Sequence, residues 1–124
     1  MPALPPRVVE FTTGHLESLE DLEVLVACMD SPERWWNAAD MALQLGLSQG
    51  AARRSLDQLA RHNLFDLRVT DDVRYRFSPG TPELEADTRA WLGEYRRNPL
   101  AVVRSIPRGR SVRDFADAFR IRRK

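Results

Sequence analysis

The sequence has a single cysteine and no long apolar run. Cys28 is the only cysteine in 124 residues, so the chain cannot form an intrachain disulfide, and a reducing cytoplasm is the expected compartment. No uninterrupted apolar stretch approaches the ~20 residues that a membrane-spanning helix needs. Residues 1–7 lack the apolar core of a secretion signal. We therefore expect a cytoplasmic protein without a membrane span, with Cys28 buried inside the apolar run 24–29.

The sequence also lacks the patterns that carry catalysis or metal binding. His15 and His62 are the only histidines, and they lie far apart in the sequence. No Cys/His cluster, glycine-rich phosphate loop or nucleophile motif occurs. We interpret both histidines as ordinary surface residues. The chain is expected to have no catalytic site, no metal and no cofactor, and to act by binding rather than as an enzyme.

Lysine is almost absent, and the basic charge is concentrated at one end. Lys124 is the only lysine among 19 basic residues. Residues 1–47 contain two arginines and eight acidic residues, whereas residues 96–124 contain ten basic residues and only Asp114 and Asp117 as acids. A basic tail of this kind is typical either of a segment that binds a polyanion or of a solvated tail. Both interpretations stay open.

The first third of the chain is predicted to form an arm and two helices. Residues 1–15 contain three prolines and are expected to be a flexible arm. Apolar residues recur at helical spacing over residues 19–29, after the capping residue Ser18. Asn37 caps a second helix, which Gly46 ends in the left-handed conformation. The aromatic segment between these helices is a candidate for a brief strand, Arg34-Trp35-Trp36.

A third helix and a β-hairpin follow. Ser48 caps a helix that runs to about His62. The apolar period then changes from helical spacing to strict alternation over residues 65–69 and again over residues 73–77, which predicts a hairpin with an apolar face and a mainly basic face. Its tip carries two acidic residues, Asp71 and Asp72.

Two further helical stretches are expected near the C-terminus. Apolar spacing over residues 83–106 predicts either one helix kinked at Pro99 or two helices. Its apolar face includes Trp91 and Tyr95, and we expect that face to form a dimer contact, with packing against the helix at 19–29 as the alternative. Ser111 then caps a basic amphipathic helix. Its stripe includes two aromatic residues expected to dock on the body or contact a partner, Phe115 and Phe119.

The order of these elements resembles a known group of proteins. The capped helix at Asn37, the turn Leu45-Gly46-Leu47-Ser48, the pair Leu56 and Leu59, and the hairpin resemble the helix-turn-helix core of bacterial winged-helix regulators, such as the MarR- and PadR-like families. The resemblance covers about residues 16–79. It implies a mainly α fold with a small β-hairpin, that is, a winged helix-turn-helix domain followed by C-terminal helices at 80–124.

The resemblance implies a homodimeric transcriptional regulator that binds double-stranded DNA. In this fold the helix at about 48–62 lies in the major groove with its N-terminal residues near the base edges. Gln can bind adenine and Arg can bind guanine there, while arginines on the hairpin can reach phosphates or the minor groove. The candidate DNA-binding residues are Ser48, Gln49, Gly50, Arg53 and Arg54 on the helix, and Arg68, Arg74 and Arg76 on the hairpin.

One alternative is kept beside DNA binding. The acidic tip Asp71-Asp72 would repel phosphate, and residues 48–78 hold six arginines but also four acidic residues. The same fold could therefore be a protein–protein interaction module that binds a transcription or membrane-associated partner. Trp35, Trp36 and the basic C-terminal helix would form its contact surface. The tryptophans could equally fill the gap between the helix at 19–29 and the hairpin.

Overall fold

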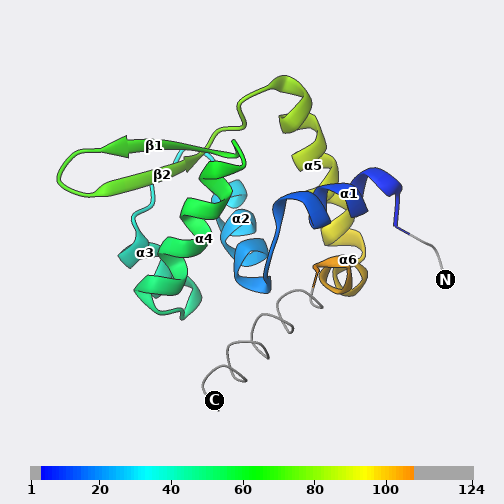
Figure 1. Ribbon diagram of the computed structural model, residues 1–124, viewed down its shortest axis with the longest axis horizontal. Helices are drawn as coiled ribbons and strands as arrows, with labels where there is room; N and C mark the ends of the chain where they lie inside the picture. Colours follow the sequence, from blue (N-terminus) through cyan, green and yellow to red (C-terminus); the bar gives the residue numbers. More distant parts are fainter. Residues whose placement is uncertain (1–3, 108–124) are drawn as a thin grey trace, which may run out of the picture.

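The computed structural model describes residues 4–107, and the predicted helix from Ser111 with Phe115 and Phe119 lies outside them. Within these residues the protein is mainly helical with one β-hairpin, as the sequence predicts (Figure 1). None of the helices in this part of the chain is long and apolar enough to span a membrane. The elements, in chain order, are α1 (Pro6–His15), α2 (Leu19–Asp30), α3 (Ala38–Leu45), α4 (Gln49–Arg61), β1 (Phe65–Val69), β2 (Val73–Phe77), α5 (Pro82–Arg97) and α6 (Pro99–Ser105).

The elements form two groups that share one core. Figure 1 shows α2, α3, α4 and the hairpin in one group and α1, α5 and α6 in the other, with the tip of the hairpin projecting away from the helices. Buried apolar residues from both groups belong to a single cluster, which includes Leu25, Leu56 and Trp91. Cys28 lies in this cluster with 1% of its surface exposed. Its burial is confirmed, and burial raises the pKa of its thiol far above the ordinary range.

Local capping chemistry determines where α2 and α3 begin and end. The Ser18 hydroxyl accepts a hydrogen bond from the Asp21 N–H at 3.2 Å, and the Asn37 side chain accepts one from the Asp40 N–H at 2.7 Å. Gly46 ends α3 with φ of +70°, a conformation that glycine adopts without steric cost. These predicted boundaries are confirmed.

The hairpin follows α4 after a left-handed residue, Asn63, with φ of +66°. Strands β1 and β2 pair antiparallel, with Leu67 opposite Tyr75. Trp36 lies on the other side of β2, where it and Tyr75 exchange two backbone hydrogen bonds of 2.8 Å. The brief strand considered at residues 34–36 is therefore reduced to a single bridge.

The prediction of a flexible arm over residues 1–15 is wrong for residues 6–15, which form α1. Pro6 occupies the first turn of this helix, where a missing N–H costs nothing. Val8, Phe11 and Thr12 form a buried stripe at helical spacing that packs on α5 and α6. The prolines and β-branched residues of this segment have low helix propensity, so the sequence alone does not indicate a helix. Packing against α5 stabilises it.

The C-terminal stretch consists of two helices, because Asn98 and Pro99 interrupt it. Trp91 is completely buried, and its indole N–H donates to the Thr12 hydroxyl at 3.1 Å. The prediction that Trp91 contacts a second protomer is therefore wrong, because α1 of the same chain covers it. Tyr95 stacks on Trp91 at 5.7 Å between ring centroids and stays partly exposed.

Candidate nucleic-acid interface

Helices α3 and α4 form a compact unit around a tight turn. The Leu47 N–H donates to the Ala42 carbonyl at 2.9 Å, which closes the turn after Gly46. The Ser48 hydroxyl then accepts from the Ala51 N–H at 3.0 Å and caps α4. Helix α4 buries one face against the core and leaves the opposite face of its first two turns exposed.

The exposed face of α4 contains the helix residues expected to bind DNA. Gln49, Gly50, Arg53 and Arg54 are all exposed, and Ser48 precedes them at the cap. Within residues 4–107, neither arginine forms an ion pair with a carboxylate. A methyl group placed on Gly50 would meet only the Arg54 Nη1 atom, at 3.7 Å. The first two turns of α4 therefore present two exposed guanidinium groups and an open backbone to solvent.

The flank of α4 that faces α2 is acidic. A cavity of 380 Å³ separates α4 from the start of α2, and Arg54 and Arg61 line it together with Glu17, Glu20 and Asp21. Burial raises the pKa of the Asp21 carboxyl, although hydrogen bonds from the Glu17 N–H, Ser55 and Ser18 oppose this effect. These carboxylates disfavour a phosphate on this side of the helix.

Each of the three hairpin arginines contacts an aspartate or a tryptophan of the same chain. Arg74 Nε lies 3.0 Å from Asp72 Oδ1, and Arg76 Nη2 lies 3.7 Å from Asp66 Oδ2. The Arg68 and Arg76 guanidinium groups each lie 4.5 Å from the centre of the Trp35 ring, a favourable cation–π distance.

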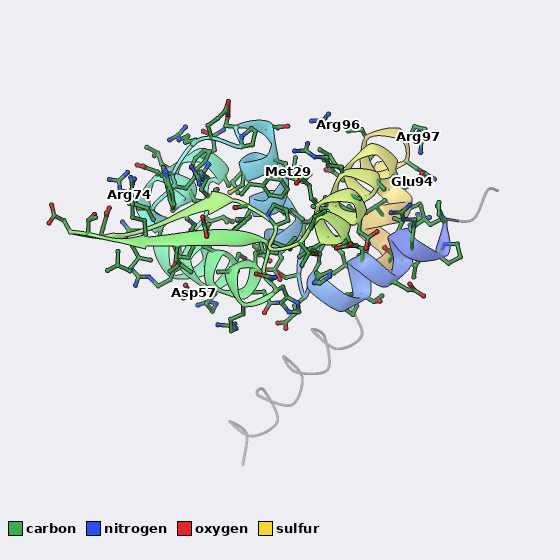
Figure 2. All side chains as sticks on the ribbon, turned by 90° about the horizontal axis from the view of Figure 1, so that it is seen from above. Met29, Asp57, Arg74, Glu94, Arg96 and Arg97 are labelled. Carbon is green, nitrogen blue, oxygen red and sulfur yellow. The ribbon has the colours of Figure 1, made fainter. Side chains whose placement is uncertain are left out.

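The hairpin arginines and α4 lie on different faces of the hairpin. The Tyr75 hydroxyl donates to the Asp57 carboxylate of α4, so the Tyr75 face of the sheet points toward α4. Burial and the hydrogen bond to Asp57 raise the pKa of Tyr75 to about 12, and the hydroxyl remains a donor at neutral pH. Arg74 lies on the opposite face, and Figure 2 shows Arg74 and Asp57 on opposite sides of the hairpin. The predicted DNA-binding residues thus form two separate sets.

Asp72 has a structural contact that sequence reasoning missed. It accepts hydrogen bonds from the Asn37 side-chain amide at 2.8 Å and from Arg74 at 3.0 Å, and these bonds lower the pKa of its carboxyl. The carboxylate therefore connects the hairpin turn to the cap of α3, and Arg74 compensates its charge. Of the two acidic residues at the tip, Asp71 is exposed and Asp72 is half-buried.

The two tryptophans that could anchor a partner are both engaged within the chain. Trp36 has 2% of its surface exposed, and the Arg34 guanidinium lies 3.7 Å from the centre of its ring. Trp35 lies between Arg68 and Arg76. The interpretation of Trp36 as a filler of the core is confirmed, and its use as a partner anchor is wrong because only 2% of its surface is exposed.

The two histidines interpreted as ordinary surface residues are in contact. His15 Nδ1 and His62 Nδ1 lie 3.0 Å apart, where the end of α1 meets the end of α4. The Gln58 side-chain amide also donates to the His15 carbonyl across this junction, at 3.2 Å. Sequence spacing gave no signal for this pair, because 47 positions separate the two residues.

Comparison with known proteins adds no assignment to this geometry. No protein-family model matches the chain, and no curated protein matches it.

Proposed function

We propose that this protein is a cytoplasmic DNA-binding transcriptional regulator of the winged helix-turn-helix type, similar to the MarR- and PadR-like families. The observation that carries the proposal is the exposed polar face over the first two turns of α4. There Gln49, Arg53 and Arg54 project from a capped helix that a tight turn joins to α3. A helix held in this way can enter the major groove of double-stranded DNA with its N-terminal residues near the bases.

Base recognition is assigned to α4 alone. The Gln49 amide can pair with adenine, and Arg53 and Arg54 can bind guanine or the adjacent phosphates. Arg68, Arg74 and Arg76 lie on the hairpin face that points away from α4. They would therefore contact phosphates only where a duplex extends past that face, and they add affinity without sequence preference.

Binding of a random-sequence DNA duplex, followed by fluorescence anisotropy at several salt concentrations, tests the proposal. For the wild-type protein we expect affinity to fall steeply with salt. The Arg53→Ala/Arg54→Ala variant should bind more weakly, with a slope of log affinity against log salt smaller by about 2, since each neutralised phosphate contributes about 0.9. Sequences that the wild type selects from the random pool should favour one base at the position that Gln49 contacts. The Gln49→Ala variant should lose this preference, which is worth about 1–3 kcal/mol of binding free energy.

Arg96→Ala/Arg97→Ala is the matched control, because it removes two exposed arginines from α5. Their side chains are 62% and 75% exposed, and Figure 2 places both far from Asp57 of α4. This control should bind DNA almost as the wild type does. Absence of DNA binding at low salt refutes the proposal. Equal losses in the two double variants would contradict the assignment to α4.

A protein-binding function was the alternative, and it loses the residues assigned to it within the described chain. Trp36 is buried, and the guanidinium groups of Arg68 and Arg76 on the hairpin lie over the Trp35 ring. Tyr95, expected at the dimer contact, lines a second cavity of 310 Å³ with Arg34 and Trp36. DNA binding by α4 is therefore the better-supported function.

A further inference from the structure

Among the described residues, the outer edge of β1 carries backbone groups without a partner strand. The backbone of Trp36 forms hydrogen bonds with both the N–H and the carbonyl of Tyr75, on the side of β2 that faces away from β1. Leu67 lies opposite Tyr75, and backbone groups of directly opposed residues point either toward each other or both outward. The N–H and carbonyl of Leu67 therefore point away from β2, and by the two-residue period so do those of Phe65 and Val69.

This edge is exposed, and it carries apolar side chains on one face of the sheet. Residues 66–69 are all exposed, and the side chains include Leu67 at 50% and Val69 at 70% exposure. Figure 1 shows β1 on the outer side of a hairpin that projects from the helical body. Natural proteins usually shield such edges, because an exposed apolar edge strand pairs readily with another strand.

We propose that β1 pairs with β1 of a second copy of this chain, antiparallel, around a two-fold axis at Leu67. In this register Leu67 faces the partner's Leu67, and Phe65 faces the partner's Val69. The exposed Leu67 pair at the axis can exchange two N–H···O hydrogen bonds. Phe65 also has outward-pointing backbone groups but is 6% exposed, so the accessible part of the edge is residues 66–69. The two hairpins then form one continuous antiparallel sheet.

Charge complementarity selects this register and a second copy as the occupant. Asp66 and Arg68 flank Leu67 on the other face of the sheet, so Asp66 lies opposite the partner's Arg68, and Arg68 opposite the partner's Asp66. Opposite charges directly across a strand pair stabilise it. A two-fold axis at Asp66 or Arg68 would instead oppose like charges, and it would need backbone groups that already bond to β2.

The inference is independent of DNA binding, and it relocates the dimer contact. The apolar face of α5 was expected to join two protomers, but α1 covers Trp91 there. The hairpin edge remains as the exposed apolar surface with a self-complementary charge pattern. A two-fold interface of this kind uses the same residues from both copies.

Leu67→Pro tests the backbone pairing. Proline removes the outward N–H at the proposed axis, and on an edge strand it breaks no hydrogen bond within the hairpin. In sedimentation equilibrium we expect a reversible dimer for the wild-type full chain and a monomer for Leu67→Pro, with the circular dichroism spectrum unchanged. A wild-type monomer at high protein concentration overturns the proposal. A dimer that persists in Leu67→Pro with full affinity also overturns it.

Charge exchange tests the register and does not require a proline. Asp66→Arg alone and Arg68→Asp alone each set like charges opposite one another, and each should weaken the dimer by about tenfold or more. The double variant Asp66→Arg/Arg68→Asp restores opposite charges across the axis and should recover most of the affinity. The double variant also lacks the Asp66–Arg76 ion pair, so recovery cannot come from that contact. A double variant as weak as the single ones overturns the register.

Discussion

The contact between His15 and His62 shows how a single pair of side chains can make stability depend on pH. When both rings are neutral, one Nδ1 donates and the other accepts across 3.0 Å. One added proton can be shared across this bond, but two imidazolium rings would repel. Burial, and then the neighbouring His62, lower the pKa of His15, while Asp87 opposes the shift. His15 is therefore expected to take up a proton less readily in the folded protein than in the unfolded chain.

Acidification should destabilise the protein through His15. Its pKa in the folded state lies below the unfolded value of about 6.5, so the unfolded chain binds a proton that the folded chain does not. The stability contribution of His15 is complete above that pH and is lost as the pH falls through the folded-state pKa. Urea unfolding at about pH 7.5 and about pH 5.5 should show a smaller loss for His15→Gln than for the wild type.

The comparison between variant and wild type isolates His15 from other titrating groups. Asp21 also titrates with an altered pKa, since burial raises it, but it is present in both proteins. An equal loss of stability on acidification in His15→Gln and in the wild type would contradict the role given to His15.

At the residue scale, the sequence predicts what neighbouring residues determine. Ser18, Asn37 and Ser48 accept hydrogen bonds from the N–H three positions along, so capping depends on local chemistry alone and is readable without a structure. The contacts of His15 with His62 and of Asn37 with Asp72 join residues 47 and 35 positions apart. Such contacts depend on how the elements pack, and spacing in the sequence does not encode them.

At the element scale, α1 is the feature that local pattern failed to predict. Its residues have weak helical preference, and its buried stripe matters only because α5 is present to receive it. Trp91 from α5 packs against Phe11 at 5.5 Å between ring centroids and donates to the Thr12 hydroxyl. The exposed face of α4, in contrast, could be predicted from the sequence. Its apolar residues recur at helical spacing, so the remaining positions form the exposed face.

The hydrogen bond between Trp91 and Thr12 should stabilise the junction of α1 and α5. Thr12→Val leaves the buried indole N–H without an acceptor and should lower the free energy of unfolding by about 1–3 kcal/mol. Trp91→Phe removes the donor and some buried volume, at a cost of about 2–3 kcal/mol. Because the second change relieves the unpaired donor, the double variant should lose less than the sum of the two, as measured by urea unfolding. Strictly additive losses would show that the bond contributes nothing.

At the scale of the whole molecule, the two groups of elements behave as one packing unit. Phe11 and Trp91 from one group share a buried cluster with Leu25 and Leu56 from the other. The Gln58 bond to the His15 carbonyl also crosses between the groups. We therefore expect a single cooperative unfolding transition for the described part of the chain.

Chemical labelling of Cys28 can report when the shared core opens. The thiol is the only one in the chain, it is 1% exposed, and burial raises its pKa so that almost no thiolate forms in the folded state. A maleimide should therefore label the protein only during excursions that expose α2. If these excursions are global, the labelling rate should rise with urea as steeply as the unfolding equilibrium does. A shallower dependence would mean that α2 opens while the remainder stays folded.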